Sequence, residues 1–110
     1  MADFNDFQKI EIRAGIVQKA EVFERVRTPA YKVWVDFGPE IGVKKTSAQI
    51  TNQYKTDELI GRRVLGVVNI GTRNIAGFVS EFLLLGLPDT NGHIHLIGYD
   101  DDSLQGVQLC

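Results

Sequence analysis

The sequence predicts a single all-β domain, a small closed or partly open Greek-key barrel with short helices. About six short stretches are either alternately apolar and polar or continuously apolar, which is the pattern of strands. Clusters of glycine, proline and asparagine separate these stretches, and one helix-like stretch lies midway. A chain of 110 residues forms one domain over 1–110. It is long enough to bury a hydrophobic core but too short for a second domain.

The N-terminal part of the chain is expected to form a short helix and then a long strand. Phe4, Phe7 and Ile10 recur at helical spacing. The strand follows over 10–22, where even-numbered positions are mostly apolar and are expected to face the core. Gly15 lies within it and allows the sharp bend or bulge that barrel strands need.

Two further strands are expected over 30–37 and 43–50, joined by a turn at Gly38-Pro39. In the first of these strands the odd-numbered positions are apolar and are expected to be buried. Lys32 and Trp34 occupy its other face. If these two side chains have no binding role, Lys32 is simply solvated and Trp34 packs at the rim of the barrel.

The second half of the chain is expected to contain strands and only one short helix. Asn-Gly within 88–92 is a strong hairpin signal. The expected elements, in order, are a helix capped by Thr56 and ended by Gly61, a strand over 62–70, an irregular segment over 71–80, a hairpin of 82–87 with 93–99, a loop over 100–103 and a last short strand within 104–110.

The stretch over 36–51 is the most informative, because a glycine and proline turn leads into a basic segment rich in hydroxyl groups. Lys44 and Lys45 supply adjacent cations, and Thr46, Ser47 and Gln49 supply neutral donors that suit phosphate and sugar oxygens. The stretch is not the phosphate-binding loop of nucleotide hydrolases. That motif needs a wider glycine spacing, a lysine directly after the second glycine and a following helix, whereas 43–50 has the pattern of a strand.

Together with the preceding Arg27-Thr28-Pro29-Ala30-Tyr31-Lys32, this stretch resembles the tRNA-binding-domain family of OB folds. Within the family it is most similar to the branch of the secretion-associated chaperone CsaA, and the resemblance extends from about Asp3 to the C-terminus. It implies an OB-fold, a five-stranded Greek-key β-barrel with additional short strands and short helices. It also implies a homodimer, with dimerisation extensions at both termini.

The resemblance implies a non-catalytic, cytoplasmic protein that acts in protein export as a chaperone. Its partners would be unfolded polypeptides or preproteins, the export machinery, and tRNA or other structured RNA. One alternative is a free-standing, structure-specific tRNA-binding protein without a chaperone role, and another is a structural subunit that docks on a different protein. The sequence shows no catalytic triad and no cofactor fingerprint, so we expect neither enzymatic activity nor a cofactor.

The resemblance also predicts individual binding residues. Lys45 joins the nucleic-acid-binding set through its position beside Lys44, and Trp34, Phe78 and Phe82 are candidates for peptide binding. We expect the cations to gather on one side of the barrel. The nucleic-acid-binding positions that the family implies are Arg13, Lys32, Lys44, Ser47, Gln49, Asn69, Arg73 and Ser80.

Two departures from the family pattern affect the loop contacts more than the basic stretch. Asn69-Ile70-Gly71-Thr72 stands where the chaperone branch commonly has Asn-Phe-Pro-Pro, and the loss of two prolines should loosen this loop. Ser80-Glu81-Phe82-Leu83 aligns with a Ser-x-x-Met segment of the RNA binders, and this chain lacks the methionine.

The remaining composition excludes several other kinds of site. The single cysteine, Cys110, excludes an internal disulfide and a cysteine-built zinc site, and His93 and His95 have no further ligand nearby in sequence. The N-terminus has no signal-peptide pattern, and no apolar run is long enough to span a membrane. We therefore expect a cytoplasmic protein without a metal and without membrane insertion.

Charge and apolar runs are unevenly distributed along the chain. All 12 Lys and Arg residues lie at or before Arg73, which gives a net charge of +3 there and −5 beyond it, and so the total of −2. This asymmetry favours a basic working surface, although chance explains it equally well at this size. The continuous apolar runs at 67–68 and 83–85 require cover on both faces, either from a second subunit or from the chain's own helix and termini.

Overall fold

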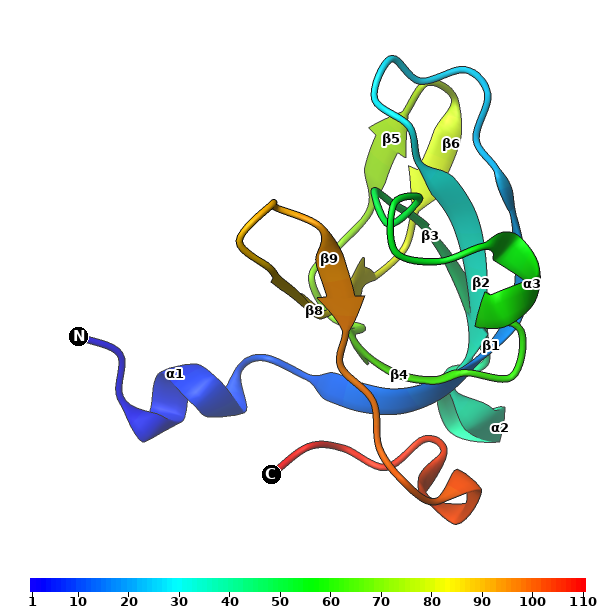
Figure 1. Cartoon of the computed structure of the whole chain (residues 1–110). Coiled ribbons are helices and arrows are strands. Elements are labelled where there is room, and N and C mark those ends of the chain that lie inside the picture. The colour runs from blue at the N-terminus through cyan, green and yellow to red at the C-terminus, as the bar shows by residue number, and fades with distance from the viewer.

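The computed structural model describes residues 1–110, and its centre is a curled sheet of antiparallel strands (Figure 1). The strand order is β3-β2-β1-β4-β7, so three hairpin-connected strands are followed by a fourth that returns beside the first. That connectivity is a Greek key. The OB-type barrel predicted from the sequence is confirmed. The strands are β1 (Ile12–Val22), β2 (Tyr31–Asp36), β3 (Val43–Ala48), β4 (Arg63–Val67) and β7 (Leu83–Leu84).

The predicted burial of β2 is confirmed, and this strand forms the centre of the core. Val33, Val35 and Phe37 are fully buried, and Tyr31 is 8% exposed. The Phe37 ring meets the Phe82 ring edge-on, with 5.0 Å between their centroids. Side chains from β1, β4 and the segment around Leu59 complete this main cluster.

The predicted buried face of β1 is confirmed at Ala14, which is 5% exposed, but it is wrong at two other positions. Val17, at an odd-numbered position, is 1% exposed, whereas Val22 is 58% exposed. The register with β2 shifts between Val17 and Lys19, and this bulge inverts the alternation so that Ala20 packs against the core. Gly15 lies before the bulge and has another role, because a side chain there would collide with Val35.

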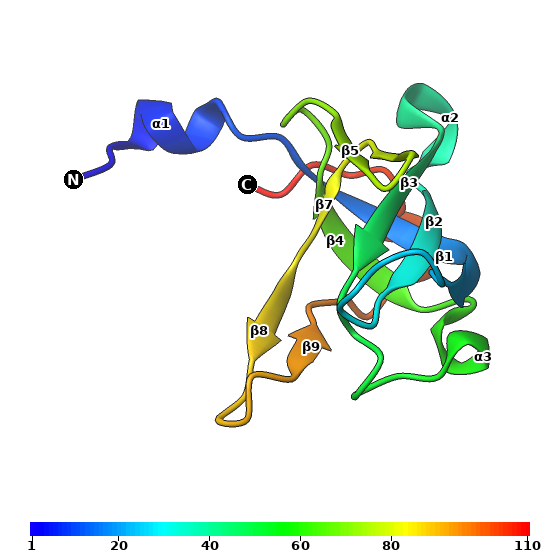
Figure 2. The ribbon, with the colours of Figure 1, turned by 90° about the horizontal axis from the view of Figure 1, so that it is seen from above.

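The short helices differ in detail from the expectation. Helix α1 (Phe4–Gln8) is capped by Asp3, and it projects away from the barrel in both ribbon views (Figures 1 and 2). The expected turn after β2 is a short helix, α2 (Gly38–Ile41), with proline in its first turn. Helix α3 (Thr56–Leu59) is capped at Lys55, because the Glu58 carboxylate accepts its backbone N–H at 3.0 Å.

The segment 71–80, expected to be irregular, contains a hairpin of β5 (Arg73–Ile75) and β6 (Phe78–Ser80). Its turn places Ala76 at φ 50° and Gly77 at φ 85°, the combination that suits a two-residue hairpin. Alanine rarely adopts a positive φ, so Ala-Gly is a much weaker turn signal than Asn-Gly.

The expected C-terminal hairpin is confirmed over a shorter range, because Leu83 and Leu84 pair with β4, and the expected last strand is not found. Strands β8 (Gly86–Pro88) and β9 (Ile94–Leu96) pair around the Asn-Gly turn. The chain then forms a single helical turn, η1 (Asp102–Leu104), and returns to β1 through one isolated bridge between Arg13 and Gln108. None of the helices has the length and apolar character needed to cross a membrane.

Candidate nucleic-acid interface

Three lysines form a strip on the outer face of β1, β2 and β3. The strand register places Lys19, Trp34 and Lys45 in one cross-strand row. The neighbouring row contains Glu21, Lys32 and Ser47. Paired residues lie on the same face of a sheet, so Lys32 and Lys45 share the outer face with Trp34. We call Lys19, Lys32 and Lys45 the lysine strip.

Aromatic rings lie beneath the lysine strip and hold its cations. Phe78 meets Phe23 and Trp34 edge-on, with centroid distances of 5.4 and 5.9 Å. Lys32 and Lys45 each place their ammonium group over the Phe78 ring, at 5.1 and 5.2 Å from its centroid. Neither lysine forms an ion pair, so no carboxylate neutralises its charge. The ring faces attract both ammonium groups through cation–π contacts.

Lys44 does not join this strip. The register pairs Lys44 with Val35, whose side chain is fully buried, and alternation along β3 therefore sends Lys44 and Lys45 to opposite faces. The expectation that all the predicted cations gather on one side fails for Lys44. Adjacent positions in a strand cannot share a face, and this rule was available from the sequence.

A groove beside the lysine strip brings together three of the other predicted residues. Ser47, Gln49 and Arg73 line it, and its volume is about 500 Å³. The loop between β1 and β2 forms one wall, and the β5–β6 hairpin forms the other. We call it the arginine groove, and its remaining lining residues are Arg25, Val26, Arg27, Thr28, Ala30, Ile75 and Ala76.

The sequence analysis assigned no binding role to Arg25 or Arg27, although Arg27 begins the stretch 27–32 that contributed to the family resemblance. Their closeness to Arg73 depends on the β5–β6 hairpin, which was also not predicted. The signal that could have indicated them is the pair of arginines two positions apart, just before the Thr28-Pro29 pair that contributed to the family resemblance.

Ser80 has a structural role in closing the barrel. It is 7% exposed, and its hydroxyl oxygen accepts the backbone N–H of Ser47 at 3.1 Å. The Glu81 carboxylate accepts the N–H of Lys45 at 3.0 Å, and the Thr46 hydroxyl donates to the Phe82 carbonyl at 2.8 Å. These side-chain bonds, together with the backbone hydrogen bond of 2.8 Å from Glu81 to the Lys45 carbonyl, join β3 to the start of β7.

Arg13 and Asn69 are likewise bonded within the chain. The Arg13 guanidinium donates to the Gly106 carbonyl at 2.8 Å and pairs with Glu11 at 2.7 Å, and its side chain is 13% exposed. The Asn69 amide accepts from the N–H of Glu11 and donates to the carbonyl of Lys9, both at 2.8 Å. Arg13 therefore attaches the C-terminal segment to β1, and Asn69 attaches the N-terminal segment to the end of β4.

The three predicted peptide-binding aromatics differ in accessibility. Trp34 is half-buried beneath Lys19, whose ammonium group lies 4.6 Å from its ring centroid. Phe78 is 8% exposed under the lysine strip, and Phe82 is 3% exposed in the main core. Burial leaves Phe78 and Phe82 as packing residues, without the exposed ring face that a peptide would need.

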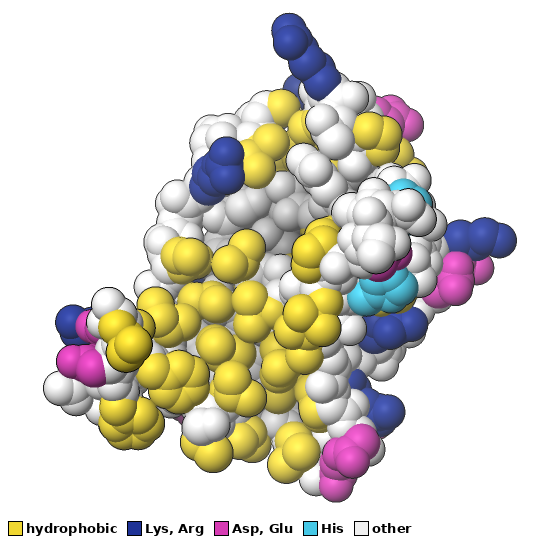
Figure 3. Space-filling model, turned by 60° about the vertical axis from the view of Figure 1, so that its left-hand side comes forward, with side chains coloured by type: hydrophobic (Ala, Val, Ile, Leu, Met, Phe, Trp, Pro, Cys, Tyr) yellow, Lys and Arg dark blue, Asp and Glu magenta, His cyan; other side chains and the backbone are white.

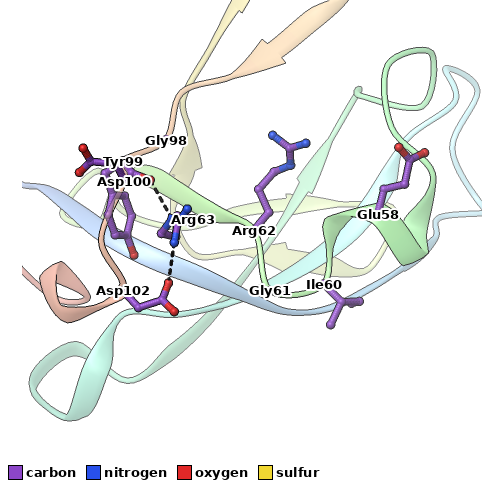
Figure 4. A pocket seen from close by; sticks show the side chains of 9 residues that line it. All are labelled: Glu58, Ile60, Gly61, Arg62, Arg63, Gly98, Tyr99, Asp100 and Asp102. Carbon is purple, nitrogen blue, oxygen red and sulfur yellow. Dashed lines mark hydrogen bonds and ion pairs between the residues drawn. The ribbon is translucent and has the colours of Figure 1, made fainter.

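A second, more open cavity of about 830 Å³ has a different character (Figure 4). Arg63 donates to the Tyr99 carbonyl at 2.8 Å and pairs with Asp102 at 3.1 Å, while Arg62 turns away from them. Burial and the nearby Asp102 raise the pKa of Tyr99. Acidic side chains outnumber basic ones around this cavity, which makes it unsuited to an anion.

The two histidines do not form a metal site in the structure. No group of three or more His, Cys, Asp or Glu side chains is arranged to hold a metal ion. The His95 ring lies 2.9 Å from Asp89, whose other carboxylate oxygen accepts the N–H groups of Asn91 and His93. These contacts order the hairpin turn.

Exposed apolar side chains gather on a face that includes α1 (Figure 3). One cavity on the molecule is lined by Phe4, Phe7, Ile10 and Leu109, from the two ends of the chain. Another cavity, of about 300 Å³, lies between the end of β3 and the strands β7 to β9. Its apolar lining residues are Ala48, Ile50, Leu83, Leu84, Ile94 and Leu96.

Comparisons with known proteins agree with this geometry. Crystal structures of the CsaA chaperone from Picrophilus torridus (43% identity, TM-score 0.93) and of chaperone CsaA from Bacillus anthracis (40% identity, TM-score 0.91) match the whole chain. The matches cover 100% and 99% of those two proteins.

Curated relatives include methionine–tRNA ligases. The ligase of Parabacteroides distasonis is 31% identical over 109 residues, and that of Chlorobium phaeovibrioides is 28% identical over 109 residues. The alignments cover 97% and 99% of this chain but only 15% of each ligase, so the similarity is confined to one part of those enzymes. A family model described as a putative tRNA binding domain matches residues 12–108, and the chain therefore belongs to that family.

Proposed function

We propose that this protein is a non-catalytic, CsaA-type binding protein that binds tRNA or other structured RNA and also holds unfolded polypeptides. The observation that carries the RNA part is the lysine strip over its aromatic rings. Ser47 lies in the same cross-strand row as Lys32 and also lines the arginine groove, so the two surfaces are continuous. The chain as a whole carries a net charge of −2, yet Lys32 and Lys45 have no carboxylate partner. Uncompensated cations on a strand face, next to aromatic rings, suit the phosphates and bases of RNA.

Salt titration tests the RNA part directly. Affinity for tRNA should fall steeply and linearly on a plot of log affinity against log salt, because each bound phosphate releases counterions. Lys45→Gln should weaken binding several-fold and reduce the slope by roughly 0.7–0.9, the loss of one phosphate contact. Lys44→Gln is the matched control, because Lys44 is adjacent in sequence but lies on the other face of β3. Equal effects of the two substitutions would contradict this interface.

The apolar cavity between β3 and β7 to β9 supports the chaperone part. It lies next to the basic surface, since Ser47 and Gln49 line both. An extended apolar segment of an unfolded polypeptide or preprotein could bury its side chains there, and apolar contact needs no ATP. The structural relatives named as CsaA chaperones support the same proposal. The setting we propose is the cytoplasm, with the export machinery as a further partner.

Aggregation of a denatured reporter protein tests the chaperone part. The protein should suppress aggregation with little dependence on salt, and Leu83→Asp, at the 48% exposed rim of the cavity, should abolish the effect. Val43→Asp is the control, because Val43 is similarly exposed (46%) and does not line the cavity. If tRNA binds and aggregation is unaffected, the protein is a tRNA-binding protein without a chaperone role.

The projecting N-terminal helix supports homodimerisation. Phe4 and Phe7 are 70% and 40% exposed, and none of the five residues of α1 is buried. Isolated helices this short are unstable in water, so α1 needs a packing partner. A second copy would cover α1 and place two RNA surfaces on one body, which raises avidity. Analytical ultracentrifugation should show a dimer, and Phe4→Ser with Phe7→Ser should convert it to a monomer.

A further inference from the structure

We infer that the arginine groove binds the phosphate of an unpaired RNA nucleotide, with Arg25 and Arg27 as its principal contacts. This inference rests on the proposed RNA-binding function and assigns a role to a loop outside the lysine strip. Arg73 belongs to the opposite wall, so arginines line the groove from both sides.

The groove is free of internal charge compensation. Arg25, Arg27 and Arg73 make no ion pair and no side-chain hydrogen bond, in contrast to Arg13 and Arg63. No carboxylate lines the groove. A guanidinium group presents several donors in a fixed plane, which matches two oxygens of a phosphate at once. Three exposed arginines without an internal partner line this one cavity, and their free donors suit a phosphate.

Both walls are held in place before any ligand binds. Phe23, Ala30 and Phe78 form a small second core that joins the β1–β2 loop to the β5–β6 hairpin, with Val26 and Ile75 packed against it. A backbone hydrogen bond of 3.0 Å from Phe23 to Ala30 closes the loop at its base. Inside the hairpin turn, the Asn74 side chain accepts the N–H of Gly77 at 2.9 Å. The backbone of the β1–β2 loop and of the β5–β6 hairpin therefore requires little ordering on binding.

The shape of the groove favours an unpaired nucleotide over a duplex. A cavity of about 500 Å³ lies within the range of small-molecule sites, and an RNA helix presents its phosphates on a convex surface that cannot enter it. Val26, Ile75 and Ala76 offer apolar wall, which suits a base or a ribose. Thr28, Ser47 and Gln49 offer hydroxyl and amide groups for polar contacts. Unpaired nucleotides in loops and ends can be turned out of the stack into such a site.

Fluorescence anisotropy with two probes tests the inference, using the full chain with a labelled oligouridylate and an RNA duplex of equal length. Arg25→Gln with Arg27→Gln should weaken oligouridylate binding by about tenfold or more, and the salt slope should fall by roughly 0.7 per lost contact. Duplex binding should change by less than about twofold. Arg62→Gln, which removes an arginine stacked over Tyr54 outside the groove, should change neither.

Each remaining outcome decides between the site and the proposed function. If the wild type binds tRNA but the double variant binds oligouridylate as the wild type does, the site is wrong and the RNA function stands. If the wild type binds no RNA at all, both are wrong. Competition by polyglutamate as effective as by oligouridylate would assign the groove to an acidic peptide and overturn the inference. Circular dichroism checks the fold, and Arg73→Gln, from the other wall, should reproduce the oligouridylate loss independently.

Discussion

Two groups of side chains are predicted from the sequence to bind RNA, and they differ in their bonding in the structure. Arg13, Asn69 and Ser80 use their polar atoms for hydrogen bonds within the chain. Lys32, Lys45 and Arg73 form no ion pair with any carboxylate. We call these the bonded group and the free group. Matching a residue type at an aligned position therefore does not establish that the side chain is available to a ligand.

Burial explains the difference for Ser80 and Arg13, whereas Asn69 is exposed and is bonded because it lies between two chain segments. A polar atom removed from water must find a partner inside the protein, because an unsatisfied buried group costs about 1–3 kcal/mol. The bonded group lies where chain segments are attached to the barrel, at its seam and at the two termini. The free group lies on an outer face and a groove wall, where water satisfies the same atoms and RNA can replace it. The comparison predicts loss of stability for one group and loss of binding for the other.

The largest effect on stability is expected from Arg13→Met. The substitution removes hydrogen bonds from a charged donor to Gly106 and Glu11, which should cost about 2–3 kcal/mol. Backbone hydrogen bonds still hold the C-terminal segment to β1. Urea unfolding measures the loss as a lower midpoint with a similar slope. Arg62→Met serves as the control and should cost well under half as much. Weaker tRNA binding by Arg13→Met protein that remains fully folded would move Arg13 into the free group.

Ser80→Ala should have the next largest effect, about 1–2 kcal/mol, because the N–H of Ser47 loses its acceptor at the barrel seam. Ser47→Ala is the matched comparison. It removes a hydroxyl at the same seam but leaves that N–H bonded to Ser80, so its cost should be clearly smaller. Equal urea midpoints for the two variants would show that the hydroxyl-to-hydroxyl contact, and not the backbone bond, holds the seam.

The sequence predicted well those parts of the fold that depend on local pattern. Alternation identified the buried face of β2, and Asn-Gly identified the β8–β9 hairpin. The same rule failed for part of β1, because the bulge after Val17 inverts the alternation and leaves no clear mark in the sequence. The β5–β6 hairpin was missed because its turn uses Ala76 at a positive φ, which tertiary contacts must impose.

The candidate site was predicted less completely, because it depends on contacts between distant segments. Residue type and the strand pattern were enough to place Lys32 beside Trp34. The bonding of Arg13 to Gly106 joins positions far apart in the chain, and no local pattern reports it. The arginine groove likewise exists only because the β1–β2 loop and an unpredicted hairpin share a small core.

Lys32→Gln should have a small effect on stability, because it belongs to the free group. Its ammonium group lies over Phe23 and Phe78, and a cation–π contact at a partly exposed site contributes about 0.5–1 kcal/mol. The loss in urea unfolding should therefore stay below about 1 kcal/mol, while tRNA affinity falls several-fold. Lys55→Gln, an exposed lysine outside the interface, should change neither quantity. A stability loss as large as that of Arg13→Met would remove the distinction between the two groups.

The smallest effect on stability is expected from the contact between Asp89 and His95. This contact is exposed, so it tests how much a hydrogen bond contributes without burial. Hydrogen bonds from the His95 side chain and the backbone N–H of His93 hold the pKa of Asp89 below its ordinary value of 3.8. A carboxylate with a lowered pKa stabilises the folded form above its ordinary value, and this contribution is lost as pH falls through the lowered one. Amide exchange in the β8–β9 turn, followed by NMR, should therefore show constant protection from neutral pH down to about 3.8 and a decline below it. Asp89→Asn should remove this decline, whereas Asp100→Asn should keep it. Protection that already falls well above 3.8 would mean that a group other than Asp89 controls the turn.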